Sequence, residues 1–299
     1  MVFTSQNLEK TETLNLKRNF PGDIMNSWIR RTLFVAATLS AMSVLAFAQD
    51  TSRGSLNCRD NWESDRLMGH CEIKEQTVAA GGTITVDARK NGGVAVKGWD
   101  RGEVLVRARI QTAAATQSEA DELAKQVRIE TAGGKIFAEG PENRRDYHWN
   151  VSYEIFVPRR SDLSLEAYNG GISIADVSGR IQFTGRNGGV VLKRVGGAVR
   201  GGTTNGGVVV ELDGSSWDGE TLDVKTTNGG IVMSVPENYS AHLETGTVNG
   251  HLSVDFPVTV QGRITRELAV NLGSGGPTVR VMTTNGGVRI KRIGSGSNN

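Results

Sequence analysis

The sequence predicts an all-β fold, organised as a β-solenoid or β-helix-like stack of two-strand coils of roughly 18–23 residues each. The first observation is a repeated hexapeptide: TTNGGV at Thr203–Val208 returns as TTNGGI at Thr226–Ile231 and as TTNGGV at Thr283–Val288. The second is that aliphatic residues follow each copy at alternate positions, which is typical of a strand with one buried face.

Asn-Gly pairs recur between residues 169 and 285 at spacings of 18, 18, 23, 21 and 36 residues. A period of this size indicates a solenoid in which each repeat stacks on the one before. Asn-Gly tolerates positive φ at both turn positions, and stacked asparagines are expected to hydrogen-bond from coil to coil. The predicted repeat turns, one of them nearer the N-terminus, are at Asn91, Asn169, Asn187, Asn205, Asn228, Asn249 and Asn285.

A second turn, such as Ser178-Gly179, interrupts each repeat before a second short strand. When successive repeats are aligned, Gly201 stands where Phe183 stood, so a large residue above a small one would fill the same core volume. A meander of β-hairpins is the alternative, because Asn-Gly also signals a hairpin. The solenoid is favoured because the first two spacings between Asn-Gly pairs are both 18 residues, and because TTNGG stands at the same position in three repeats.

The chain before the repeats is less regular. Residues 58–160 are predicted to be a β-rich portion that covers the open end of the repeat region, 161–293, because terminal repeats need caps. Within this portion, Gln117–Val127 reads as one short helix, with Ser118 and Asp121 in capping-box spacing. The tail, 294–299, is predicted to be disordered.

Residues 25–48 are typical of a secretory signal peptide. A basic start, Arg30-Arg31, precedes a short apolar run and the small-x-small pattern Ala46-Phe47-Ala48. An uncleaved membrane anchor is the alternative, although a spanning helix needs about 20 apolar residues. We interpret residues 1–24 as an over-extended gene start, and we expect the protein in the periplasm, on the outer surface or secreted.

The two cysteines, Cys58 and Cys71, follow the predicted cleavage point. In an oxidising compartment such a pair is expected to form a disulfide. A Cys₂His₂-type metal site using His70 is the alternative, and the distance along the chain to the other histidines disfavours it.

The charge balance implies no basic surface for nucleic acid or anionic lipid. The chain has 34 basic and 32 acidic residues, and residues 1–48 contain five and three of them, so 29 of each remain after cleavage. A net charge near zero predicts no nucleic-acid partner.

The signal peptide, the NGG-[VI]-x-[VIL] repeats and the segment Val151–Pro158, VSYEIFVP, together resemble a known family. It comprises exported bacterial β-strand-repeat proteins of a "putative adhesin" domain-of-unknown-function family, similar to the head domain of putative auto-transporter adhesins. The resemblance spans about Glu72–Ile293. It implies an adhesin-like role and supplies no catalytic residue.

A polysaccharide-active β-helix enzyme, a lyase or glycoside hydrolase, is the alternative function. Glycoside hydrolysis needs two carboxylates on one surface, but Asp176, Asp213 and Asp255 do not share one phase of the repeat. Arg289 and Lys291, in an R-I-K element, are interpreted as charges that guard an end strand. We therefore predict no enzyme activity, catalytic residue, cofactor or metal.

One surface remains as a candidate for function. Period two places Val191, Val209 and Val232 on the outside of consecutive coils, where they would form an apolar strip. The alternatives are that β-branched residues simply suit a sheet, or that the N-terminal portion covers them. The sequence thus predicts an exported binding or structural module whose partner is an envelope or extracellular protein, a polysaccharide or a second copy.

Overall fold

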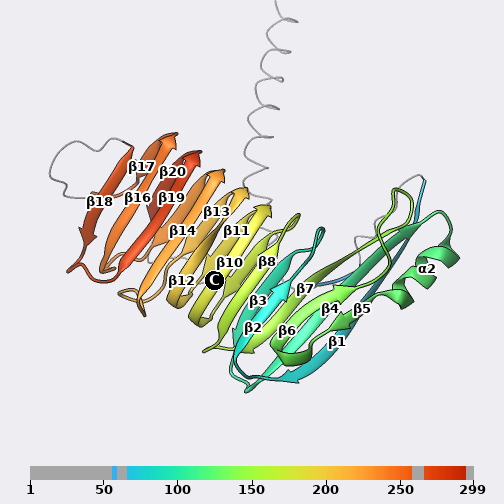
Figure 1. Cartoon of the computed structure of the whole chain (residues 1–299). Helices are drawn as coiled ribbons and strands as arrows, with labels where there is room; N and C mark the ends of the chain where they lie inside the picture. Colours follow the sequence, from blue (N-terminus) through green and yellow to red (C-terminus); the bar gives the residue numbers. More distant parts are fainter. Residues whose placement is uncertain (1–55, 59–65, 258–265, 294–299) are drawn as a thin grey trace, which may run out of the picture. The chain divides into compact units, whose positions relative to one another are not determined.

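The computed structural model describes residues 56–58, 66–257 and 266–293. The predictions for residues 1–24, 25–48 and 294–299 lie outside the described residues. Within them the fold is all-β, as predicted, with two sheets of ten strands each and a single α-helix (Figure 1).

The first sheet carries the strands that follow the Asn-Gly turns. Its strands are, in spatial order, β1 (Met68–Ala79), β4 (Glu103–Ala114), β7 (His148–Pro158), β3 (Val94–Trp99), β9 (Ile172–Ala175), β11 (Val190–Lys193), β13 (Val208–Glu211), β15 (Ile231–Val235), β20 (Val288–Arg292) and β17 (Leu252–Val254).

The second sheet carries the strands that lead into those turns. Its strands are, in spatial order, β18 (Glu267–Leu272), β16 (Ala241–Asn249), β19 (Thr278–Asn285), β14 (Thr221–Asn228), β12 (Gly196–Asn205), β10 (Ser178–Asn187), β8 (Asp162–Ala167), β2 (Thr83–Asp87), β6 (Lys135–Glu139) and β5 (Arg128–Glu130).

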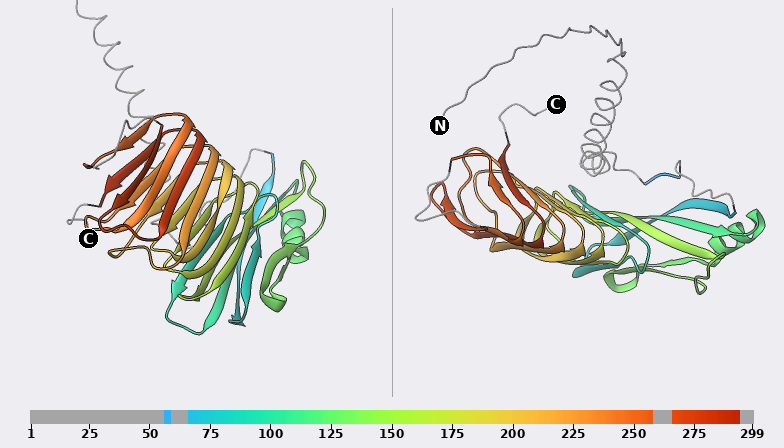
Figure 2. Two further views of the ribbon diagram at one scale, coloured as in Figure 1. Left: turned by 60° about the vertical axis from the view of Figure 1, so that its left-hand side comes forward. Right: turned by 90° about the horizontal axis from the view of Figure 1, so that it is seen from above.

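From β8 to β15 the chain alternates between the two sheets, and each strand from β8 to β13 pairs in parallel with the strand two positions later. The register follows the sequence period: Ile181 pairs with Val199, and Val190 pairs with Val208, in each case one repeat further on. Figure 2 shows these strands lying side by side in both sheets. The repeat in the sequence is therefore a repeat of neighbouring, in-register strands.

At both ends of the two sheets, the spatial order of the strands departs from their order in the sequence. β19 lies between β14 and β16, and β20 lies between β15 and β17, with all four pairings parallel. The expectation that each repeat stacks on the one before is therefore wrong for the last repeat. At the other end, β2 and β3 pair directly with β8 and β9, although β4–β7 separate them in sequence.

The core lies between the two sheets and is built from the alternating aliphatic residues. One row runs in register across the first sheet from Ile172 through Val190, Val208 and Ile231 to Val288, each about 1% exposed. The second sheet contributes matching rows, such as Ile181, Val199 and Leu222. Outward-facing neighbours stay mostly polar, so the pattern of period two fixes the register of the strands.

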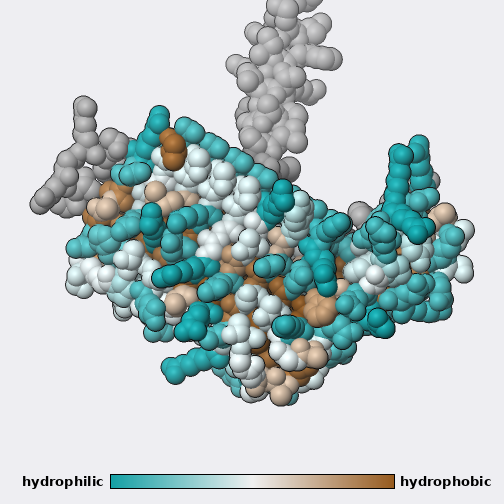
Figure 3. Space-filling model, viewed as in Figure 1, coloured by the Kyte–Doolittle hydropathy of each residue, from teal (hydrophilic) through white to brown (hydrophobic). Residues whose placement is uncertain are grey.

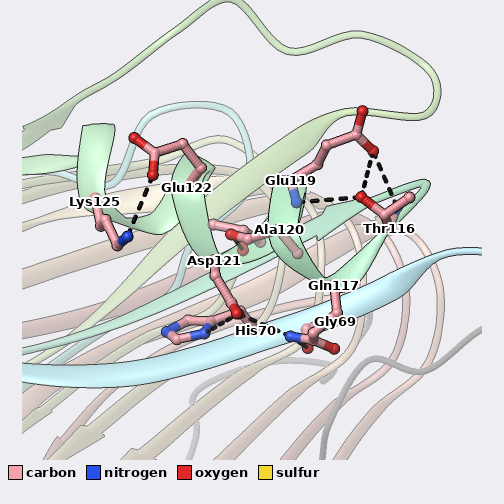
Figure 4. Close-up of polar contacts among 10 residues, drawn as sticks. Gly69, His70, Thr116, Gln117, Glu119, Ala120, Asp121, Glu122 and Lys125 are labelled. Carbon is pink, nitrogen blue, oxygen red and sulfur yellow. Dashed lines mark hydrogen bonds and ion pairs between the residues drawn. The ribbon is translucent and has the colours of Figure 1, made fainter.

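The α-helix is α2 (Gln117–Gln126), which packs on β1 and β4 through the buried Ala120, Leu123 and Ala124. The helix was predicted, but its cap was not: the capping box is Thr116 with Glu119, not Ser118 with Asp121. Thr116 precedes the first helical turn, where its hydroxyl accepts from the Glu119 amide (Figure 4). Asp121 instead bonds His70 of β1.

Cys58 and Cys71 form a disulfide with their Cα atoms 5.7 Å apart, which confirms the predicted pairing. Cys71 lies in β1, so the bond ties the preceding segment to an edge strand. On the chain-entropy model, closing a loop of this length contributes roughly 3 kcal/mol to stability.

Candidate functional site

The asparagines of the repeat turns form a continuous ladder along one edge of the stack. Each amide nitrogen except that of Asn91 donates to the amide oxygen of the asparagine on the adjacent strand, at 2.7–2.9 Å. All the asparagines are exposed. We call this row the asparagine ladder; its members in order are Asn249, Asn285, Asn228, Asn205, Asn187, Asn169 and Asn91, and each donates to the next.

The glycines after these asparagines are required by close packing. The expected positive φ is not found: within the described residues, neither the ladder asparagines nor the glycines that follow them have one. Instead, a Cβ on Gly206 would lie 2.1 Å from the carbonyl oxygen of Gly188, and a Cβ on Gly229 would lie 2.0 Å from that of Gly206. Only glycine lets the turns approach this closely.

The first threonine of each TTNGG copy links neighbouring turns at the same edge by a buried hydrogen bond. Thr203, Thr226 and Thr283 are buried, and each hydroxyl donates at 2.8 Å to the carbonyl of the glycine one strand away. The second threonine faces out, as Thr204 and Thr227 do. The repeated motif is thus explained residue by residue by stacking, and it specifies a scaffold.

The predicted apolar strip lies on the outer face of the first sheet. Val191, Val209 and Val232 are register partners on β11, β13 and β15. Val191 is buried, with 9% of its surface exposed, whereas Val209 and Val232 are partly exposed. None of the three belongs to the core cluster between the sheets. We call these residues the valine strip.

The valine strip is bordered on one side by glycine and on the other by charge. The second glycine of each turn, for example Gly189, Gly207 and Gly230, precedes the strip residue by two positions and adds no side chain to this face. On the other side, Lys193 pairs with Glu211 at 3.6 Å. In the view of Figure 3, the surface mixes hydrophilic and near-neutral residues, with hydrophobic residues in small patches.

His70 and Asp121 form an imidazole–carboxylate pair, the arrangement that orients a catalytic base. The His70 Nδ1 lies 2.8 Å from the Asp121 carboxylate, which also accepts from Gln117 (Figure 4). The opposite nitrogen, Nε2, is buried and has no hydroxyl or thiol partner among the described residues. The hydrogen bonds from Gln117 and His70 lower the pKa of Asp121. The pair therefore braces α2 against β1.

Two of the three carboxylates considered for glycoside hydrolysis, Asp176 and Asp255, are held in ion pairs. Arg194 donates to both oxygens of Asp176, at 2.7 and 2.9 Å, and Arg289 donates to Asp255 at 2.8 Å. These hydrogen bonds lower the pKa of each carboxyl group, which is unfavourable for a general acid.

Position also separates these two acids. They follow β9 and β17, five strand spacings apart, or about 24 Å. The carboxylates of glycosidases lie roughly 5–9.5 Å apart. Asp213 and Asp176 both line a smaller cavity of about 400 Å³, beside the Asp176–Arg194 ion pair.

A larger cavity, of about 740 Å³, lies at the edge that carries the asparagine ladder, where β6 pairs with β2 and β7 pairs with β3. We call it the terminal cavity. Lys90 and Asn91 contribute to it from the β2–β3 turn, and Trp149 and Tyr153 contribute from β7. Asn91 was predicted as a repeat turn, and Tyr153 lies in the segment VSYEIFVP noted above. The sequence did not indicate that these residues meet, because β7 comes from a distant, non-repeating part of the chain.

Two further properties bear on the site. No helix in the described part of the chain has the length and apolar character to cross a membrane. Nor do three His, Cys, Asp or Glu side chains meet, within residues 56–58, 66–257 and 266–293, in a group that could hold a metal ion.

Comparison with known proteins finds no matching family model and no matching curated protein. Solved structures do match at low identity. A putative cell adhesion protein from Clostridium sporogenes has a TM-score of 0.41 at 11% identity, with 76% of this chain and 100% of that chain covered. A putative adhesin from Bacteroides fragilis has a TM-score of 0.31 at 11% identity, with 74% and 97% covered.

A putative adhesin from Parabacteroides merdae has a TM-score of 0.30 at 10% identity, with 75% and 97% covered. These proteins carry the same name, putative adhesin or cell adhesion protein, as the family that the sequence resembles.

Proposed function

We propose that this protein is an exported, non-catalytic module that binds or supports other envelope components in the manner of an adhesin. In this proposal the strands from β8 onward form a solenoid of two-strand coils, residues 161–293 are the repeat region, and residues 58–160 cap it. The observation that carries the proposal is the in-register valine strip, Val191, Val209 and Val232, beside a row of glycines.

The mechanism is contact through a repeated surface. Strand neighbours lie about 4.8 Å apart, so a partner meets the same chemistry at each step along the strip. The glycines have no side chains that would stand between the valines and a partner. The valines offer apolar area to a protein, a polysaccharide or a second copy. The Cys58–Cys71 disulfide supports an oxidising compartment, and the near-zero net charge supports a partner other than nucleic acid.

The ion-paired acids support a binding module over the polysaccharide-active enzyme. Asp176 and Asp255 are each engaged by an arginine and lie about five strand spacings apart. A hydrolase of this fold would need two other carboxylates that face each other across a substrate.

The test is Val209→Lys, with Thr204→Lys as the matched control on the outer face of the second sheet in the same repeat. Both positions face outward, so both variants should keep the fold and melt close to the parent protein. A lysine ammonium in an apolar contact is costly to desolvate. We therefore expect only Val209→Lys to reduce self-association in light scattering or recovery of partners from envelope fractions.

Two results would count against the proposal. If Val209→Lys lowers stability while Thr204→Lys does not, the strip is covered within the chain and is not a contact surface. If both variants retain stability, oligomeric state and envelope partners, the strip has no binding role.

A further inference from the structure

The terminal cavity is large enough for a ligand. Its volume, about 740 Å³, falls in the range of roughly 300–1,000 Å³ that small-molecule sites occupy. It is built from the β2–β3 turn, the segment after β6 and the start of β7, which parallel pairing holds together. Its walls are thus supported by sheet hydrogen bonds.

One wall is a fixed indole. The Trp149 ring nitrogen donates to the Pro141 carbonyl at 2.8 Å, and Asn143 exchanges two hydrogen bonds with the Trp149 backbone. Gly140 lies against the ring, because a Cβ there would be 2.9 Å from it. A fixed indole offers an apolar surface next to polar groups at little entropic cost, which suits the C–H face of a sugar ring.

The asparagine ladder ends at this cavity with Asn91, whose amide nitrogen has no partner in the ladder. Every ladder amide points its nitrogen the same way, and the chain of hydrogen bonds stops at Asn91. The Asn91 oxygen accepts from Asn169, but its own nitrogen donates to no other described residue, and Asn91 lines the cavity. Aligned hydrogen bonds polarise one another, so this free N–H group is a strengthened donor.

A buried hydroxyl provides a second, independent sign of a ligand. Tyr153 is 1% exposed and lines the cavity, and its hydroxyl has no hydrogen-bond partner in the described part of the chain. Burial raises the pKa of Tyr153, so the hydroxyl remains protonated and able to donate. A buried polar group without a partner is costly, and a ligand oxygen would satisfy it.

The charges around the cavity are balanced once existing ion pairs are accounted for. Arg128 pairs with Glu139 at 3.8 Å, and Arg89 pairs with Asp87 at 3.6 Å. Lys90 and Glu142 have no ion pair among the described residues, and they oppose each other in sign. The free donors at Asn91 and Tyr153 therefore tip the balance toward oxygen-rich, negatively charged groups.

We propose that the terminal cavity binds a saccharide that carries a carboxylate, such as a uronic or sialic acid residue. Trp149 packs against the ring, while Asn91, Tyr153 and Lys90 donate to the carboxylate and hydroxyl oxygens. This site lies apart from the valine strip, so either can fail without the other.

Calorimetric titration of the purified protein tests the proposal with two acidic probes, trigalacturonate and sialyllactose, and their neutral counterparts, maltotriose and lactose. At least one acidic probe should bind about tenfold more tightly than its neutral counterpart, a difference of about 1.4 kcal/mol. Asn91→Asp should abolish this binding, because it keeps the oxygen that accepts from Asn169 but replaces the free donor with a negative charge. Lys90→Glu and Tyr153→Phe should each weaken it at least severalfold.

The control is Asn249→Asp at the opposite end of the ladder, outside the cavity, where the change adds the same charge and also removes the hydrogen bond that Asn249 donates to Asn285. It should leave probe binding unchanged. Absence of binding by both acidic probes, equal binding of acidic and neutral probes, or binding that survives both Asn91→Asp and Lys90→Glu would overturn the proposal. Lys90→Glu keeps the test independent of folding, because the Lys90 side chain is exposed.

Discussion

The ring of Phe183 lies against Gly201, its register partner on the neighbouring strand. A Cβ on Gly201 would come within 2.7 Å of ring atoms Cγ and Cδ2 and within 2.3 Å of the Phe183 carbonyl oxygen. Gly201 therefore provides the space that Phe183 fills, as the alignment of successive repeats predicts. Gly201→Ala should lower the free energy of unfolding by about 1–3 kcal/mol, because the strand or the ring must shift.

The measurement is urea unfolding of Gly201→Ala beside Gly102→Ala. Gly102 has open space around its Cα and no positive φ, so its change should be near neutral. Equal midpoints for the two variants would show that the Phe183 contact is not tight.

The two glycines of one turn give the second prediction. A Cβ on Gly206 would lie 2.1 Å from the Gly188 carbonyl oxygen, whereas a Cβ on Gly207 would lie 3.4 Å from that of Gly230. Gly206→Ala should therefore cost at least about 2 kcal/mol, and Gly207→Ala less than about 1 kcal/mol. Thermal melts of the two single variants check this ranking, and a reversed order would contradict the close stacking of the turns.

The asparagine ladder gives the third prediction. Asn205 accepts from Asn228 and donates to Asn187, both at 2.8 Å, and its backbone φ is not positive. Asn205→Ala should cost about 1–2 kcal/mol from the two lost hydrogen bonds, since the groups are exposed and water replaces part of them. Asn205→Val should cost a similar amount, because no left-handed backbone has to be strained.

Denaturant melts of both variants, with Thr204→Ala as the exposed neighbour, decide this point. A much larger cost for valine than for alanine would indicate backbone strain at the turn. No cost for either variant would mean that the ladder contributes nothing to stability.

The sequence predicted the repeated part of the fold because its residues repeat. The repeat period places Val190 beside Val208, and the alternating pattern decides which of their neighbours face the core. The insertion of β19 between β14 and β16 was not predictable in this way. Strands of the same pattern are nearly interchangeable as neighbours, so the order depends on the connections and not on the local sequence.

The two candidate sites also differ in how far the repeat predicts them. The valine strip is local to the repeat, so period two alone suggested it. The terminal cavity joins Asn91 to Tyr153 through pairing of β3 with β7, across more than half of the non-repeating portion. The positive φ of Arg194, 48°, also had no sequence signal, because arginine rarely adopts it; Asp176, with φ of 60°, is of a residue type that adopts it more readily.

The last prediction concerns the pH dependence of stability at Asp176. Arg194 donates to both of its carboxylate oxygens, and these hydrogen bonds lower the pKa of Asp176 in the folded protein below its ordinary value of 3.8. A carboxyl group whose pKa is lower when folded contributes stability above its unfolded pKa and loses it as the pH falls through the folded pKa. Because the pair is partly exposed, we expect about 0.5–1 kcal/mol near neutral pH.

Asp176→Asn tests this contribution, because asparagine tolerates the left-handed backbone while it removes the charge and one of the two oxygens that accept from Arg194. Asp218→Asn is the control, since Asp218 is exposed and has no ion pair in the described residues. Urea melts should show Asp176→Asn less stable than the parent at neutral pH, with the difference shrinking below about pH 4 and in high salt. A difference that stays constant from neutral pH down to pH about 2 would mean that the loss comes from the hydrogen-bond geometry and not from the charge of Asp176.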